Sequence, residues 1–296
     1  MSGISGVLRA LDRRLVLGIL CMCGSGLVFP VMNSAAKLLG AHYNSVQISW
    51  ARAFGHVVFL MLAFLPQYGT SFLKTKRPGL QAVRSAMLFL SNLCFFFAIS
   101  YIPIAQAASI SMTGPLVVAL LAWPMLGERT TKLRLALLAV GFAGVVIVIR
   151  PGSALFHWAS LFVVLNSCFY GVYQILTRRV STIDSPATSA FFSSVVGAFV
   201  MLAVMPFVWR SPANGFDLLL FCSMGVLGAT GHYCVAWALR LAPANLVSPF
   251  QYFQLIGSVL VGYLIFDDLP DVWTWVGAGV IVASGLAMGW SQARKA

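Results

Sequence analysis

Charged residues are scarce in this chain of 296 residues, and acidic residues are scarcer still. Only 9% of the residues are charged, and just seven are Asp or Glu, whereas about 25% are charged in an ordinary globular domain. Because 60% of the residues are hydrophobic, a core formed by the chain itself could not bury so much apolar surface. The composition therefore excludes an ordinary soluble protein and predicts a chain that lies in a lipid bilayer.

Motifs for catalysis and metal binding are also missing. The six cysteines form no CxxC pair, and the apolar runs contain no HExxH, no GxSxG and no paired aspartates. The net charge of +12 comes from Lys and Arg in short breaks between apolar runs, not from a basic stripe with interleaved aromatic residues. We therefore expect no enzyme, no metal, no cofactor and no nucleic-acid partner.

Ten apolar runs of about 20 residues predict ten transmembrane helices, because that length crosses the bilayer as a helix. The connections between them are short and leave no aqueous domain. The predicted spans are residues 14–38, 44–66, 80–101, 104–126, 132–149, 154–178, 185–209, 217–240, 244–266 and 271–291.

The distribution of Lys and Arg predicts the orientation of the chain. Fifteen of them, Arg84 included, fall on one predicted side, whereas the other side carries only Lys37, Arg150 and Arg210. Since cytoplasmic loops hold the excess of positive charge, both termini are expected in the cytoplasm. The acidic cluster Asp267, Asp268 and Asp271 then lies outside.

The sequence also contains an internal repeat. MLAFLP at Met61–Pro66 recurs as MLAVMP at Met201–Pro206, 140 residues later, and the same offset aligns Cys94 with Cys234. Since each half holds an odd number of predicted helices, the second half enters the membrane in the opposite orientation, as in many transporters whose substrate site lies between the halves. The predicted units are a five-helix repeat at 14–149 and an inverted five-helix repeat at 154–291.

Two segments carry a resemblance to a known family. They are LLAWPMLGERTTKLRLALLAVGFAGVVIVI, with Gly-Glu after the fourth predicted helix, and LVGYLIFDDLPDVWTWVGAGVIVASGLAMG, where Asp268 replaces the usual glutamate. The chain resembles the EamA-type branch of the drug/metabolite transporter superfamily, and within it most resembles bacterial amino-acid exporters. The resemblance implies an all-α integral membrane fold of ten transmembrane helices in two inverted five-helix repeats.

One charged residue lies near the centre of a predicted span. Arg52, in ISWARAFGHVVFLMLAFLP, has no acidic residue at its own depth, and His56 lies one turn further along the same face. A central charge is costly and must face protein or a water-filled cavity. Either Arg52 is a structural group bonded to free carbonyls and hydroxyls, or it lines a cavity and pairs with a substrate carboxylate.

Polar and aromatic residues at helical spacing predict a hydrated central cavity, and prolines that interrupt three helices predict hinges. For single residues the alternative is hydrogen bonding between helices, and for single prolines a static kink. The predicted cavity residues are Arg52, His56, Asn92, Ser109, Ser111, Asn166, Tyr170, Tyr173, His232, Tyr233, Trp237, Ser248, Gln251 and Tyr252, and the predicted hinges are Pro30, Pro115 and Pro249.

These features predict a transporter of the bacterial inner (cytoplasmic) membrane that exports small metabolites, first among them amino acids, including aromatic ones, by alternating access. Because no carboxylate lies within the spans, we expect facilitated diffusion or exchange, with proton coupling through histidine as the alternative. Another cargo, such as a cationic drug or a nucleoside-type metabolite, stays open, and so does a homodimer. A channel or an intramembrane enzyme is a more distant possibility.

Overall fold

The computed structural model describes residues 2–126, 132–153, 156–180, 183–241 and 248–293, and in these residues every regular element is a helix. The elements are α1 (Ser2–Gly40), α2 (Ser45–Tyr68), η1 (Ser71–Leu73), α3 (Pro78–Ile99), α4 (Ile104–Ser111), α5 (Gly114–Leu126), α6 (Lys132–Ile149), α7 (Ala159–Val180), α8 (Pro186–Val200), η2 (Met201–Ala203), α9 (Met205–Val208), α10 (Gly215–Leu241), η3 (Ser248–Tyr252), α12 (Phe253–Phe266) and α13 (Val272–Ala293).

Within the described residues, six helical stretches are long and apolar enough to cross a membrane. They lie in α1, α2, α3, α7, α10 and the segment Pro186–Ala203. Four shorter apolar stretches, Ile104–Val118, Leu135–Ile149, Phe250–Phe266 and Val272–Ala287, fall at the other four predicted spans. The all-α membrane fold expected from the sequence is therefore confirmed.

Two of the shorter spans are interrupted at equivalent places. The first breaks between Ser111, where α4 ends, and Gly114, where α5 begins next to Pro115, and the second begins as the 3-10 helix η3 before it continues as α12. Proline cannot donate a backbone hydrogen bond, which weakens a helix at that point. At Pro30, by contrast, α1 continues without a break.

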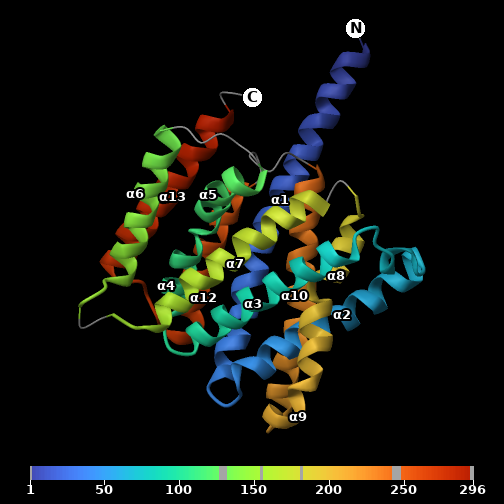
Figure 1. Ribbon diagram of the computed structural model, residues 1–296, viewed down its shortest axis with the longest axis vertical. Coiled ribbons are helices and arrows are strands. Elements are labelled where there is room, and N and C mark those ends of the chain that lie inside the picture. The colour runs from blue at the N-terminus through green and yellow to red at the C-terminus, as the bar shows by residue number, and fades with distance from the viewer. Residues whose placement is uncertain (1, 127–131, 154–155, 181–182, 242–247, 294–296) are drawn as a thin grey trace.

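The two halves contact each other through equivalent helices, so that each contact has a counterpart when the halves are exchanged (Figure 1). The most extensive contacts join α1 to α10, and the equivalent helices α7 and α3 pack against each other in the same way. Helix α2 packs against α8, and α6 packs against α13. The start of α1 and the end of α13 lie at the same end of the molecule, which is the arrangement that an even number of spans requires.

Small residues allow the closest of these helix pairs. A Cβ atom added to Gly225 of α10 would lie 2.5 Å from the Cα of Gly55 in α2, and one added to Gly144 of α6 would lie 2.9 Å from the carbonyl oxygen of Gly277 in α13. Small residues let helix backbones approach in a membrane, where dispersion and not the hydrophobic effect holds helices together. These contacts fix the frame around the centre.

Candidate functional site

A cavity of about 100 Å³ lies at the centre of the molecule, between α1, α3, α7, α10 and the interrupted segments α4–α5 and η3–α12. Its polar lining consists of Ser25, Asn33, Ser91, Asn92, Ser111, Asn166, Tyr170, His232, Gln251 and Gln254. Its apolar lining consists of Gly26, Phe29, Met32, Leu88, Phe95, Met112, Gly114 and Val235. The volume is room for several water molecules, at about 10–15 Å³ each on this measure.

Ten of the eighteen lining residues form pairs separated by the repeat offset of 140 residues. Five such pairs line the cavity, namely Gly26 and Asn166, Asn92 and His232, Phe95 and Val235, Ser111 and Gln251, and Gly114 and Gln254. The cavity therefore lies where equivalent positions of the two halves face each other. The members of each pair differ chemically, so a symmetric frame presents an asymmetric surface.

Asn166 joins three helices at the wall of the cavity. Its amide nitrogen donates to the hydroxyl of Ser91, at 2.7 Å, and to the carbonyl of Ser91, at 3.0 Å. Its amide oxygen accepts from the hydroxyl of Ser111, at 3.2 Å. Both groups of the amide thus have partners on α3 and α4, which fixes the direction in which this side chain faces the cavity.

Arg52 lies behind the cavity wall. It is fully buried, at 1% exposure, and its Nη2 donates to Nε2 of His232 over 2.9 Å. No acidic side chain in the described residues forms an ion pair with it. His56, one turn along α2, faces α8 and donates from Nε2 to the carbonyl of Ala190 over 3.0 Å. Arg52 therefore reaches the cavity through His232, and not directly.

A second buried arginine, Arg84 in α3, was counted among the loop charges in the sequence. The structure buries it almost completely, at 1% exposure, and it donates to Gln81, Thr177, Ser193 and the carbonyl of Ser189. Its guanidinium also lies 5.3 Å from the ring centre of Tyr173. The polar stripe at helical spacing in α3, from Gln81 through Ser85 to Ser91 and Asn92, is the signal that could have identified it.

Arg84 is linked to Asp184, in the connection between α7 and α8, through Gln81. The Gln81 amide oxygen accepts from Arg84 Nε at 3.0 Å, and its amide nitrogen donates to Asp184 Oδ2 at 2.8 Å. Asp184 also accepts from the hydroxyl of Thr75 at 2.6 Å. This chain of contacts connects the two halves at the end of the molecule where Asp184 lies.

The predicted site residues divide into those that line the cavity and those that lie elsewhere. Those that line it are Asn92, Ser111, Asn166, Tyr170, His232 and Gln251. Those outside the lining are Arg52, His56, Ser109, Tyr173, Tyr233, Trp237 and Tyr252. The side chains of Ser248, Pro115 and Pro249 fall outside the described part of the structure.

The residues outside the lining have other partners. Ser109 bonds within its own helix, to the carbonyl of Ala105 at 2.8 Å. The ring of Tyr233 packs 5.1 Å from Phe64 and 6.2 Å from Trp237. Four polar lining residues were not among the predicted cavity residues, namely Ser25, Asn33, Ser91 and Gln254. Ser25 and Asn33 lie two turns apart on one face of α1. Their spacing in the sequence could therefore have indicated that both face the cavity.

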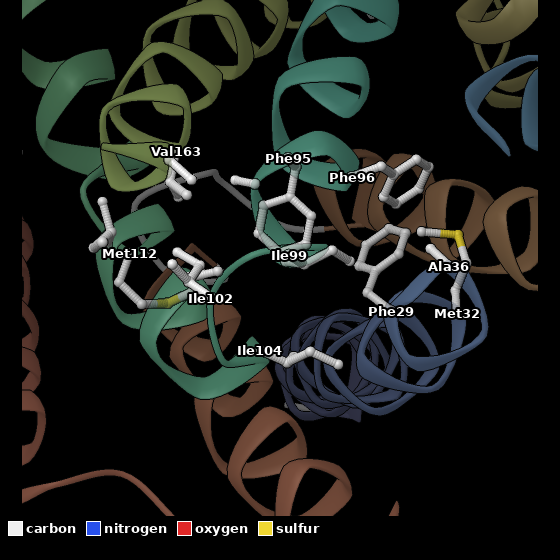
Figure 2. Packing of buried hydrophobic residues seen from close by; sticks show 14 of the residues in the cluster. Phe29, Met32, Ala36, Phe95, Phe96, Ile99, Ile102, Ile104, Met112 and Val163 are labelled. Carbon is white, nitrogen blue, oxygen red and sulfur yellow. The ribbon is translucent and has the colours of Figure 1, made fainter. Parts of the chain in front are cut away.

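The cavity continues into a packed apolar layer toward the end that carries the α1–α2 connection. Phe29 and Met32 of α1 and Phe95 of α3 belong to both. Figure 2 shows them with Phe96, Ile99, Ile102, Ile104, Met112 and Val163, which come from α3, from α4 and the residues that flank it, and from α7. Because the layer is apolar and buried, it separates the polar cavity from that end of the molecule.

Polar contacts beyond this layer tie the halves together. Lys37 and Asp268 form an ion pair at 3.4 Å, and Arg150 and Asp271 form one at 2.5 Å. Desolvation opposes the charge of Asp271, but hydrogen bonds from Thr274 and the charge of Arg150 outweigh it and hold its pKa below the ordinary value.

Tyr43 makes a third contact between the halves at this end. Its hydroxyl donates to Asp217 at 2.6 Å, and that hydrogen bond raises the pKa of Tyr43, with desolvation as a smaller cause. Together with the two ion pairs, this bond connects α1 and its following loop to α10 and to the end of α12.

The fold and the site define a multi-pass membrane protein whose polar cavity lies between two equivalent halves. Comparison with known sequences gives its family. The pattern of the EamA-like transporter family matches residues 16–150 and again residues 157–289. The chain belongs to this family of membrane transporters, as the resemblance in the sequence implied.

Curated relatives are similar over most of their length. An S-adenosylmethionine uptake transporter of Rickettsia conorii is 28% identical over 87% of each chain. A riboflavin transporter of Rhizobium johnstonii is 28% identical over 95% of this chain and 94% of its own, and one of Vibrio cholerae is 28% identical over 90% and 91%. A solved crystal structure shares the fold, with a TM-score of 0.64 at 18% identity over 96% of this chain and 99% of that one. These relatives are named as transporters of other solutes, so the amino-acid cargo stays a prediction.

Proposed function

We propose that this transporter is a carrier of the bacterial cytoplasmic membrane for small, uncharged metabolites that combine a flat nitrogen heterocycle with hydroxyl groups. The observation that carries the proposal is the lining of the cavity. It offers amides and hydroxyls next to the rings of Phe29, Phe95 and Tyr170, and the described lining residues include no Asp, Glu, Lys or Arg.

An amide side chain has both a donor and an acceptor, which is what the edge of a nitrogen heterocycle requires. Asn92, Gln251 and Gln254 supply three such groups. The amide of Asn166 is held by Ser91 and Ser111 and sets the shape of the wall. Aromatic rings offer offset-stacked or edge contacts to a flat ligand at centre distances of about 4.5–7 Å. A cavity with these groups can bind a heterocycle both at its edge and on its faces.

The same lining disfavours a fully charged cargo. A charged group that leaves water without a partner incurs a large desolvation penalty, and Arg52 lies outside the lining, with its Nη2 bonded to His232. A zwitterionic amino acid or a quaternary drug would therefore lack a matching charge at the wall. Of the alternatives raised by the sequence, the nucleoside-type metabolite fits the cavity best.

The names of the relatives point in the same direction. Riboflavin is an uncharged flat heterocycle with a hydroxylated chain, and S-adenosylmethionine contains an adenosine unit in addition to its charged part. Both compounds thus share a nitrogen heterocycle with attached hydroxyls. The uncharged compound agrees better with the described lining, so we expect a riboflavin-like ligand to bind more tightly than S-adenosylmethionine.

Binding requires the cavity to widen. Pockets for small molecules usually measure about 300–1,000 Å³, whereas this cavity measures about 100 Å³. Two halves that pack as equivalents around the cavity can tilt about it, so that it opens to each side in turn. With both termini in the cytoplasm, the Lys37–Asp268 and Arg150–Asp271 pairs close the extracytoplasmic side, and the direction of net flux follows the substrate gradient.

Counterflow into liposomes tests this proposal. Purified protein is reconstituted with unlabelled riboflavin, adenosine, S-adenosylmethionine, phenylalanine or a quaternary cation inside, and uptake of the matching labelled compound is followed with and without a pH gradient. We expect saturable counterflow of riboflavin or adenosine that needs no pH gradient. Counterflow of phenylalanine alone would establish the amino-acid cargo instead, and flux that does not saturate would indicate a channel.

A matched pair of variants connects the flux to the cavity. Asn166→Leu removes the amide that α3 and α4 hold in place, so we expect loss of counterflow at normal folded yield. Ser167→Ala changes the neighbouring residue, whose hydroxyl bonds to the carbonyl of Val163 at 3.1 Å inside the same helix, and counterflow should be retained. Equal flux in both variants would contradict a role for the cavity wall in binding.

A further inference from the structure

The contact between Arg52 and His232 fixes the position of a proton. A guanidinium has only donors and stays charged in proteins, so the nitrogen that contacts it must accept. That nitrogen is Nε2 of His232, 2.9 Å from Nη2 of Arg52. The proton of the neutral imidazole is therefore on Nδ1, which is buried and has no partner in this conformation.

The surroundings of His232 oppose a second proton on its ring. Beside Arg52, α2 presents His56, whose ring centre lies 6.0 Å away. From α7, Tyr173 contacts the ring edge-on at 6.1 Å and carries Arg84 on its own face, and from α1 the neighbour is Phe29 at 5.0 Å. No carboxylate in the described residues faces the ring. Protonation would break the bond to Arg52 and place two cations in contact in a low-dielectric interior.

We propose that Arg52 is a positioning residue that holds His232 as a neutral imidazole with its proton on Nδ1, so that His232 serves the cavity as an uncharged hydrogen-bonding group and not as a proton carrier. The inference rests on the proposed carrier function for its consequence in transport, which is flux without proton coupling through this histidine. The position of the proton itself can be measured without any transport.

The repeat supports the assignment independently. The position equivalent to His232 in the first half holds Asn92, an amide that does not titrate, and the position equivalent to Arg52 in the second half holds Phe192. The position that holds a histidine therefore has an arginine at its partner position, whereas the equivalent position that holds an asparagine has a phenylalanine there. This distribution is expected if the arginine is there to keep the imidazole neutral.

Nitrogen NMR of histidine provides the direct test. Protein labelled with ¹⁵N-histidine contains four such residues, and His232→Gln identifies the signals of His232. We expect one protonated and one unprotonated nitrogen, with the proton on Nδ1, at every pH from about 5 to 8, a range that spans the ordinary histidine value of about 6.5. A proton on Nε2, or a doubly protonated ring at the acidic end, would overturn the proposal.

Variants extend the test to function. In Arg52→Gln, His232 should become protonated on acidification, and riboflavin counterflow should change by more than about threefold across the range in which histidine titrates. Arg52→Gln/His232→Gln should lose that dependence, whereas Arg52→Gln/His56→Gln should keep it. If Arg52→Gln does not fold, Arg52→Lys retains a donor and should leave the wild-type signals of His232 unchanged. A pH dependence that survives in Arg52→Gln/His232→Gln would contradict the proposal.

Discussion

The crossing of α2 and α10 is a close backbone contact beside the site, and it sets the distance between Arg52 and His232. A Cβ atom at Gly225 would meet the carbon atoms of the Gly55 backbone and lie 2.8 Å from its carbonyl oxygen. Backbone cannot rotate away as a side chain can, so Gly225→Ala must push the helices apart. Overpacking of this kind costs about 1–3 kcal/mol, and the better helix propensity of alanine returns at most about 1 kcal/mol.

Thermal unfolding in detergent measures the net change in stability that results from these two opposing effects. We expect the midpoint of Gly225→Ala to fall by several degrees, since about 1 kcal/mol shifts the midpoint of a large domain by 2–4 °C. Gly55→Ala should be milder, because its Cβ would lie 3.0 Å from the Cα of Gly225. The control is Gly279→Ala, where nothing lies within 4 Å, and its midpoint should not fall. A Gly225→Ala midpoint at or above that of the wild type would refute this account of the crossing.

Two further predictions concern the buried and the exposed charges. Arg84→Gln should lower the free energy of unfolding by about 1.5–3 kcal/mol, because the buried oxygens that accept from the guanidinium would lose their charged donor. A denaturation midpoint equal to that of the wild type would contradict this. Asp271→Asn should lower the unfolding midpoint at pH 7, and this difference should shrink as the pH falls below the unfolded value. The folded-state pKa of Asp271 is depressed, so its stabilisation is complete above the unfolded value of about 3.9 and is lost as the pH falls through the folded value. A difference that stays constant as the pH is lowered from 7 through the acidic range would rule out the ionised carboxylate as its source.

The helices could be predicted from the sequence because lipid imposes a length and a composition on each of them. The break at Gly114 was predictable too, since Pro115 removes a backbone donor. Pro30 shows the limit of that reasoning, because α1 continues through it. Whether a proline breaks a helix depends on neighbours that hold the two ends in line, and Gly257 of α12 packs directly against Pro30.

The two arginines show why the site could be predicted only in part. Arg52 stood out because its neighbours in sequence are apolar, which is local information. Arg84 lies close to a cluster of loop charges, and its burial depends on Thr177, Ser189 and Ser193, about a hundred residues away. In the same way, Tyr233 and Trp237 are residue types that suit a cavity wall, but Tyr233 packs against Phe64, and Trp237 packs against Tyr233. Such facts follow from tertiary packing and not from spacing.

The members of the five equivalent pairs that line the cavity differ in size. In four of them the larger polar side chain, Asn166, His232, Gln251 or Gln254, comes from the second half, opposite Gly26, Asn92, Ser111 or Gly114 of the first. Two of these four groups are also bound to the first half, because Asn166 bonds to Ser91 and Ser111 and His232 accepts from Arg52. A movement of one half against the other would have to break these bonds, so the side chains that line the cavity are also the ones that couple the two halves.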